Sequence, residues 1–198
     1  MILFARLIIV VFTSFLAQIS LADKLPLAQI SKYLNDLKTV EGNFTQVNDD
    51  GTISTGILYI KRPGKMRLEY DPPNNALVIA SNKAVYIIDK KSNQMPETYP
   101  LRRTPLSNNL APNVNLSRQK MVVGHDYDGT ATIITAQDPK NTEYGSILMK
   151  FSDEPVQLRQ WIVRDSSGGE TTVVLETLTT GVNLSNRLFD LPSREREN

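Results

Sequence analysis

The stretch Thr52–Asp71, TISTGILYIKRPGKMRLEYD, decides how the rest of this chain is arranged. Two runs of strand-forming residues flank Pro63-Gly64, a dipeptide that marks a turn, so the stretch predicts a β-hairpin. A two-residue loop would pair Arg62 with Lys65 and would give a face that mixes apolar with charged side chains. A three-residue loop pairs Arg62 with Met66, with glycine supplying a positive φ. We adopt this second register because it gives faces of coherent character.

This register divides the hairpin into an apolar face and a polar face. Side chains alternate along a strand with a period of two, so a slip of one residue would exchange the faces. Arg62 falls among the apolar side chains, and a buried guanidinium needs acceptors for its donors. The hairpin therefore predicts an apolar sheet face that carries one cation. The other members of that face are Leu58, Ile60, Met66, Leu68 and Tyr70, whereas Ile57, Tyr59, Lys61, Arg67 and Glu69 share the opposite face.

The first 22 residues are typical of a secretory signal peptide. One positive charge, Arg6, precedes the apolar run Leu7–Leu16, and the small-residue ending Ser20-Leu21-Ala22 predicts cleavage before Asp23. The apolar run is short for a membrane span; an uncleaved anchor or a buried helix is the alternative. No cysteine follows the cleavage site, which argues against a lipid anchor there. We therefore expect an exported, soluble protein in which residues 23–198 form one domain.

The composition argues against several classes of function. The 198 residues carry a formal net charge of +1, which Arg6 in the predicted signal peptide accounts for. Neither nucleic acid nor an anionic membrane is therefore expected to be held by long-range attraction. The absence of cysteine excludes a disulfide framework, thiol catalysis and cysteine-ligated zinc. We expect a monomer that is stabilised by the burial of apolar surface.

One long helix is expected after the signal peptide. Pro26 fits the first helical position, where a missing N–H has no partner to lose. Apolar residues then recur at helical spacing until about Lys38. The helix is amphipathic, so its apolar stripe must cover another apolar surface. The stripe consists of Leu27, Ile30, Leu34 and Leu37.

The remainder of the chain is typical of one antiparallel sheet, because about ten short runs of strand-forming residues are bounded by turn residues at regular spacing. Several runs are apolar on both faces, such as Ile147–Phe151 and Val173–Leu175, whereas a sheet with one wet face alternates. One long helix and a short one that begins at Thr104-Pro105 cannot cover a sheet of that width. We therefore predict a mainly β fold with a helical lid (α+β), in which an incomplete antiparallel barrel curls around either a filled core or a hydrophobic cavity.

Catalytic or metal-binding chemistry has little support in the sequence. The single histidine, His125, lies in Gly124–Gly129, where Asp and Gly are also the residues that a β-turn favours. One histidine without clustered ligands is a weak metal site, so we interpret this segment as a solvated turn. No nucleophile elbow, phosphate-binding loop or His-Glu-x-x-His motif occurs. We expect neither an enzyme activity nor a metal or cofactor.

Three segments follow one another in an informative order. Glu41–Gln46 reads EGNFTQ, Gly56–Tyr70 contains Arg-Pro followed by Met-Arg-Leu-Glu-Tyr, and Ser81–Asp89 reads SNKAVYIID. They are similar to the G-x-F-x-Q signature, the R-P-x-x-(hydrophobic)-R-x-x-Y stretch and the D-G-x-x-(hydrophobic)-(aromatic)-x-Y-D segment of the LolA family of outer-membrane lipoprotein carriers. Two departures are that Leu68 stands where several relatives carry an aromatic residue, and that the chain after Pro192 lacks the valine-rich tail of some members.

The resemblance implies an incomplete β-barrel with helices as a lid over a hydrophobic cavity. It also implies a periplasmic carrier that accepts acylated lipoproteins from an inner-membrane ABC transporter and delivers them to an outer-membrane acceptor. In that family the arginine before the proline, here Arg62, acts as a latch that holds the lid closed by hydrogen bonds. This role agrees with the register argument, which places Arg62 on the apolar face.

We therefore predict a lipid-binding cavity whose walls come from the hairpin and its neighbouring strands. Each buried methylene stabilises binding by about 0.8 kcal/mol, so acyl chains are held by many weak apolar contacts. A carrier or sensor of other lipids, or a protein-interaction domain with a filled core, are the alternatives. The predicted cavity residues are Leu58, Ile60, Met66, Leu68, Tyr70, Ile79, Ile87, Met149 and Phe151; the lid-helix residues are Leu27, Ile30, Leu34 and Leu37, with Arg62 as the latch.

Overall fold

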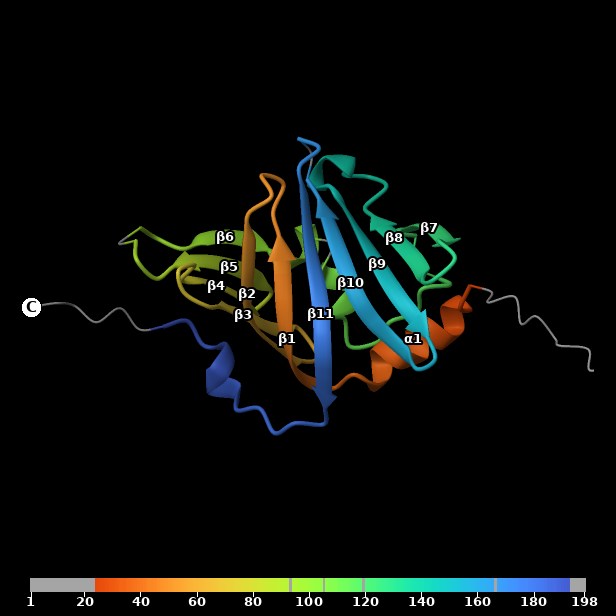
Figure 1. The fold of residues 1–198 in the computed structure, drawn as a ribbon, viewed down its shortest axis with the longest axis horizontal. Helices are drawn as coiled ribbons and strands as arrows, with labels where there is room; N and C mark the ends of the chain where they lie inside the picture. Colours follow the sequence, from red (N-terminus) through yellow and green to blue (C-terminus); the bar gives the residue numbers. More distant parts are fainter. Residues whose placement is uncertain (1–23, 93, 105, 119, 166, 193–198) are drawn as a thin grey trace, which may run out of the picture.

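A computed structural model describes residues 24–92, 94–104, 106–118, 120–165 and 167–192. The predicted signal peptide lies outside these residues. One eleven-stranded antiparallel sheet makes up most of the described chain, in the order β6-β5-β4-β3-β2-β1-β11-β10-β9-β8-β7 (Figure 1). The strands are β1 (Thr39–Val47), β2 (Ile53–Lys61), β3 (Lys65–Tyr70), β4 (Ala76–Ser81), β5 (Ala84–Asp89), β6 (Glu97–Pro100), β7 (Val122–Tyr127), β8 (Thr132–Gln137), β9 (Ser146–Asp153), β10 (Val156–Arg164) and β11 (Glu170–Thr180).

The first and last strands lie side by side in the middle of the sheet. β1 pairs with β11, and β6 and β7 remain at the two edges, so the sheet curls without closing (Figure 1). The predicted mainly β fold with an incomplete antiparallel barrel is confirmed.

The helical parts are α1 (Leu27–Asp36), α2 (Leu106–Asn109) and the 3₁₀ helices η1 (Leu101–Arg103), η2 (Thr142–Tyr144) and η3 (Asn186–Phe189). None of the described helices has the length and apolar character needed to cross a membrane.

The hairpin of β2 and β3 has the predicted faces but a different register. Lys61 pairs with Lys65, and Ile60 pairs with Met66, so the predicted pairing of Arg62 with Met66 is wrong by two residues. Arg62 leaves the β2–β3 ladder because its backbone N–H donates to the Lys38 carbonyl at 2.8 Å. A shift of two residues preserves the alternation, so the partition of side chains between the faces is unchanged.

The concave face of the sheet holds the main core. Phe44 is fully buried, and its ring meets that of Tyr70 edge to face with centroids 5.1 Å apart. A Cβ atom at Gly56 would lie 2.9 Å from the Phe44 ring, so glycine is needed there for this packing. The core continues through Met149 and Phe151 of β9, which are also fully buried.

Helix α1 covers part of this concave face and packs against β10 (Figure 1). Pro26, the predicted first helical position, is the N-cap instead, so the helix begins one residue later than predicted, and the Pro26 carbonyl accepts the Ile30 N–H. The helix ends at Asp36, two residues earlier than predicted, and the Leu37 N–H donates to the Tyr33 carbonyl.

A smaller core lies on the opposite, convex face. The segment after β11 crosses β3 and β4 with η3, where Leu184 and Phe189 are buried. Leu77 and Ile79 of β4 are buried on this side, because they pair with Glu69 and Arg67 rather than with the inward-facing residues of β3.

Candidate functional site

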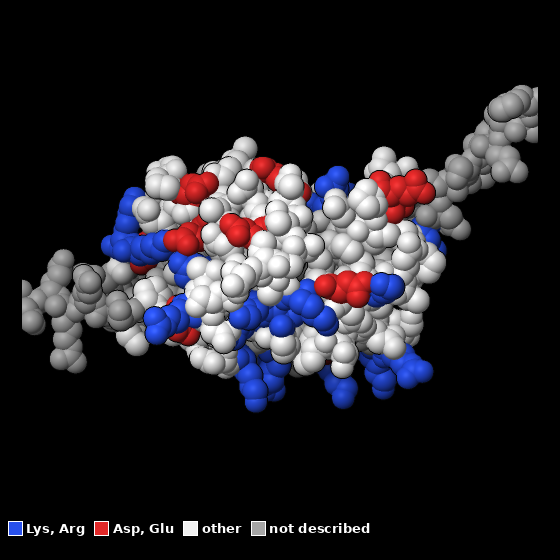
Figure 2. Space-filling model, turned by 90° about the horizontal axis from the view of Figure 1, so that it is seen from below, with Lys and Arg blue, Asp and Glu red and all other residues white. Residues whose placement is uncertain are grey.

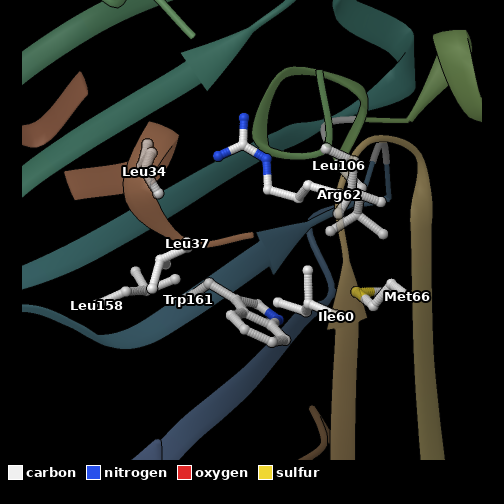
Figure 3. A pocket seen from close by; sticks show the side chains of 9 residues that line it. Leu34, Leu37, Ile60, Arg62, Met66, Leu106, Leu158 and Trp161 are labelled. Carbon is white, nitrogen blue, oxygen red and sulfur yellow. The ribbon is translucent and has the colours of Figure 1, made fainter. Parts of the chain in front are cut away.

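A small apolar cavity lies between the concave face and its cover (Figure 3). Its volume is about 40 Å³, and Arg62 is the one charged group among the described residues that line it. Since a single water needs roughly 10–15 Å³ of such volume, the space corresponds to only a few water molecules. The lining side chains are those of Leu34, Leu37, Ile60, Arg62, Met66, Leu106, Leu110, Leu158 and Trp161.

Four parts of the chain build this cavity. Helix α1 and its C-cap residue supply Leu34 and Leu37, and the β2–β3 hairpin supplies Ile60 and Met66. The other walls are Leu158 and Trp161 of β10 and Leu106 and Leu110 from the segment around α2. In Figure 3 the Arg62 guanidinium points away from the sheet, toward the space between α1 and the segment around α2. We use the word lid for α1 together with residues 101–118.

The Arg62 guanidinium is only partly satisfied. Nη2 donates to the Ala111 carbonyl at 2.5 Å, while Nε and Nη1 are buried without a hydrogen-bond partner among the described residues. Burial lowers the pKa of Arg62 below its usual value. An unpaired buried donor destabilises by about 1–3 kcal/mol, and more on a charged group. The contact of Arg62 with Ala111 therefore retains an unfavourable contribution.

Hydrogen bonds join the two parts of the lid to each other. The Asn35 side chain donates to the Val114 carbonyl and accepts the Val114 N–H, both at 2.8 Å. The Ser31 hydroxyl accepts the Leu116 N–H at 3.0 Å and donates to the Leu27 carbonyl at 2.6 Å. Because these bonds cross between α1 and the segment 114–116, the two parts form one connected cover.

The N-terminal end of α1 is fastened to the sheet through polar groups that sequence reasoning missed. The Leu25 N–H donates to the buried Thr132 hydroxyl at 2.8 Å, and the Leu25 carbonyl lies 2.9 Å from His125 Nε2. His125 lies in β7, so its interpretation as part of a solvated turn is wrong. Further along α1, the Tyr33 hydroxyl accepts the Leu158 N–H at 3.0 Å.

No metal site forms around His125 among the described residues. Asp128 accepts from the Thr130 hydroxyl and N–H, from the Ala131 N–H and from Lys150, so its carboxylate organises the turn between β7 and β8. These bonds hold the pKa of Asp128 far below its usual range, with the hydroxyl contact first in importance. The Asp-Gly sequence here is a structural turn.

The predicted site residues occupy three different environments. Five of them line the cavity: Ile60, Met66, Arg62, Leu34 and Leu37. Most of the others lie in the main core beside or below it, namely Leu58, Leu68, Tyr70, Met149, Phe151 and Ile30, with Leu27 partly buried against it. Ile87 pairs with Val78, on the concave side of β4, but is 39% exposed near the sheet edge.

The expectation that Ile79 faces the cavity is wrong. Ile79 pairs with Arg67, which belongs to the convex face, and its side chain is buried outside the main core. The reason is the register of β4 against β3, which the sequence of β4 alone did not fix, since Leu77, Val78, Ile79 and Ala80 are apolar on both faces.

Four lining residues were not predicted, and a β-bulge explains two of them. The pairing of β10 with β9 shifts between Leu158 and Gln160, so Leu158 and Trp161 share a face although they are three residues apart. A period-two analysis places them on opposite faces. Leu106 and Leu110 belong to α2 and its end, where the Thr104-Pro105 helix signal indicated a helix but not its contact.

Comparison with known proteins adds independent information. Residues 35–192 match the family model described as outer membrane lipoprotein carrier protein LolA. The chain is similar to the outer-membrane lipoprotein carrier proteins of Coxiella burnetii strain CbuK_Q154 (25% identity, covering 84% of this chain and 82% of the relative) and Nitrosomonas europaea (26% identity, covering 84% of each). The carrier protein of Methylococcus capsulatus is 25% identical over 86% of this chain and 85% of its own length.

Solved structures agree on the fold. A conserved protein from Thermus thermophilus superposes with a TM-score of 0.50 at 11% identity, covering 85% of this chain and 93% of its own. A domain from Vibrio parahaemolyticus, named for outer membrane lipoprotein sorting, gives a TM-score of 0.50 at 10% identity and covers 84% and 96%. Identity this low supports the shared architecture alone. Since the family model matches residues 35–192, which is most of the chain, this protein belongs to the LolA family of outer membrane lipoprotein carrier proteins.

Proposed function

We propose that this protein holds the acyl chains of a lipoprotein between its curled sheet and its lid, and that the lid must move to admit them. The family is one of non-catalytic periplasmic carriers, which agrees with the expectation of a carrier rather than an enzyme. Binding of lipoproteins for transfer follows from the family. The acyl-chain cavity, the latch and the individual partners are our own assignments.

The observation that carries this proposal is an apolar interior that is closed by one incompletely satisfied cation. The cavity of about 40 Å³ is lined by leucine, isoleucine, methionine and tryptophan, with Arg62 at its lid side. Such a space cannot hold an acyl chain, whose every buried methylene contributes about 0.8 kcal/mol. Binding therefore requires the lid to move away and expose the leucines of α1 and the apolar face of the hairpin together.

The energetics of the latch suit a carrier that must also release its cargo. One Arg62 hydrogen bond favours closure, whereas two unpaired buried donors oppose it. Closed and open states separated by a few kcal/mol can both be populated, and cargo shifts the balance only by its differential affinity. Affinity spread over many apolar contacts allows handover to a partner that offers equivalent burial.

We infer the partners from the direction of transport. Acylated lipoproteins come from the inner membrane, so an inner-membrane lipoprotein-releasing ABC transporter is the expected donor. An outer-membrane acceptor is the expected recipient. The expected monomer is consistent with a carrier that presents its lid to each of them in turn.

Mass spectrometry of material that co-purifies with the native protein from a periplasm tests the proposal. Acylated lipoproteins are the expected species, and they should displace an apolar fluorescent probe from the purified protein. Recovery of free phospholipids or other small lipids alone would favour a carrier or sensor of those lipids. A protein that neither co-purifies with lipid nor binds the probe would contradict a cavity that opens.

A further inference from the structure

We propose that the lid side of this protein docks on an anionic phospholipid bilayer, through a cation-rimmed groove beside the latch. The inference goes beyond the carriage of acyl chains and concerns a surface outside the cavity. It begins from the distribution of charge, which the near-neutral composition conceals. Between residues 98 and 125 the sequence has no Asp or Glu, whereas it has Arg102, Arg103, Arg118 and Lys120.

Three of these cations, Arg102, Arg103 and Arg118, belong to the lid, and the acid-free segment includes η1, α2 and the rest of the lid after β6. In Figure 2 several Lys and Arg side chains project from the lower edge of the view, whereas most acidic side chains lie in the middle and toward the upper edge. A nearly neutral chain thus carries locally basic surface, and such a surface attracts anionic surfaces over about one Debye length, roughly 8 Å at physiological ionic strength.

A groove of about 630 Å³ adjoins the lid, between η1, the end of α2 and the turns that follow β2 and β4. Lys83 in the β4–β5 turn and Arg102 in η1 bring two cations to it from separate elements, and Lys65 at the start of β3 lines it with its ammonium bonded to Asn186 Oδ1 at 3.0 Å. Its walls include Leu101, Leu110, Pro63, Pro112 and Gly64. No carboxylate of the described residues forms an ion pair with any of these three cations. Cations around apolar walls match an amphiphile with an anionic headgroup.

The backbone of Lys83 supports a role for its side chain. Asn82 and Lys83 have φ values of 49° and 64°, the left-handed region in which Asn is tolerated and Gly is favoured at the second turn position. A lysine at this position is conformationally unfavourable. Such an outlier points to a function for the residue that occupies it, and here the function is to place a cation at the groove.

The same turns argue for a bilayer rather than an acidic peptide segment. Backbone groups that an extended peptide would pair with are already used internally. The Gly64 N–H donates to the Leu110 carbonyl at 2.9 Å, and the Leu101 N–H donates to the Lys83 carbonyl at 2.8 Å. A phospholipid headgroup needs only cations and apolar contact. Because each Lys or Arg near an anionic leaflet strengthens binding about fivefold, Lys83 and Arg102 together strengthen it by about 25-fold.

Sedimentation of the cargo-free protein with lipid vesicles tests this proposal separately from cargo transfer. We expect binding to vesicles of phosphatidylglycerol and phosphatidylethanolamine that weakens as salt is added, and none to vesicles of phosphatidylcholine. The double variant Lys83→Glu with Arg102→Glu should weaken binding by about a hundredfold or more. Its matched control, Lys90→Glu with Lys91→Glu, makes the same change in net charge roughly 20 Å away, at the other end of β5, and should bind nearly as well as the parent.

The variant Lys83→Gly tests whether a loss of vesicle binding comes from the lost charge or from misfolding. Glycine relieves the left-handed backbone, so this variant should melt at an equal or higher temperature than the parent while binding anionic vesicles about fivefold more weakly. Lys91→Gly serves as its control for loss of one charge. Equal losses in the lid-side and control variants would overturn the proposal. Absence of binding to anionic vesicles would also overturn it and would leave an acidic protein surface as the partner of this side.

Discussion

The two faces of the β2–β3 hairpin are covered in opposite ways. On the concave face the lid meets the hairpin beside a cavity of about 40 Å³, through the Arg62 bond to the Ala111 carbonyl and the Gly64 N–H bond to the Leu110 carbonyl. On the convex face the segment 182–192, which we name the C-terminal clasp, is held by bonds from three cations. Lys61 Nζ donates to the Leu184 carbonyl at 2.6 Å, Lys65 Nζ to Asn186 Oδ1 at 3.0 Å, and Arg67 Nη1 to the Leu188 carbonyl at 3.1 Å.

The difference agrees with the proposal that the lid moves, because the clasp covers a buried aromatic side chain. Phe189 is 1% exposed beneath the clasp and packs under Lys65, whose ammonium lies 5.9 Å from its ring centroid. The lid has a void and two unpaired buried donors, whereas the three cations at the clasp have hydrogen-bond partners. We therefore expect the lid to move and the clasp to stay in place.

Removal of the Phe189 ring should have the largest effect, because it empties the core under the clasp. We expect Phe189→Ala to lower the free energy of unfolding by about 3–5 kcal/mol, as measured by urea denaturation. Leu191→Ala, at a side chain that is 44% exposed, is the control and should change it by less than about 0.5 kcal/mol. Equal effects of the two substitutions would show that the clasp does not close a core.

Alkaline pH should lower the free energy of unfolding because Tyr70, in the core on the concave face, must ionise. Burial raises the pKa of Tyr70 to about 12, and its hydroxyl donates to Gln46 Oε1 at 2.6 Å. A tyrosine with a raised pKa contributes stability that is complete below pH 10, the unfolded value, and is lost as pH rises to about 12. The loss should approach about 2–3 kcal/mol in urea titrations. Tyr70→Phe should remove this part of the pH dependence, and an unchanged pH profile would contradict the assignment.

Replacement of Arg62 tests whether this residue controls the opening of the lid. Arg62→Leu gives up one charged hydrogen bond, worth about 1.5–3 kcal/mol, but removes two unpaired buried donors that oppose closure by about 1–3 kcal/mol each. We therefore expect a lid that opens less, with uptake of an apolar probe and release of cargo slowed roughly tenfold and the fold intact.

The matched control for the latch is Arg67→Leu, which removes a guanidinium from the convex face of the same hairpin. It should lower stability through the clasp and leave probe uptake near the parent value. Faster uptake in Arg62→Leu would mean that the bond to Ala111 outweighs the unpaired donors. Unchanged uptake and release would remove Arg62 from the mechanism.

The smallest expected effect concerns the connection between the two parts of the lid. Asn35→Ala removes both hydrogen bonds to Val114, together worth about 1–2 kcal/mol. Hydrogen exchange at the Val114 amide should accelerate by roughly tenfold, while global stability changes little. Asn115→Ala, at an exposed neighbour, is the control. If Val114 exchange is unchanged, the two parts of the lid are held together by apolar packing instead.

The sequence predicted the site residues wherever the two-residue alternation of side chains along a strand is clear. The alternation of side chains placed Ile60, Met66 and Arg62 on one face even though the predicted register was wrong, because an error of two residues leaves the faces unchanged. It failed for Ile79, where apolar residues on both faces hide the alternation, and for Leu158 and Trp161, which a β-bulge brings to one face. Hydrogen bonds such as that between His125 and Leu25 join residues 100 positions apart, so no local sequence pattern predicts them.

The sequence by itself determined the antiparallel mainly β architecture, the amphipathic helix and the apolar face that carries Arg62, since all three follow from the spacing of side chains along short segments. Only the tertiary structure decided what each apolar face meets: the lid on one side of the hairpin and the clasp on the other. The reason is that burial depends on contacts between distant segments, and those contacts are set by strand register, bulges and loop paths. The same reason explains why a nearly neutral chain carries locally basic surface.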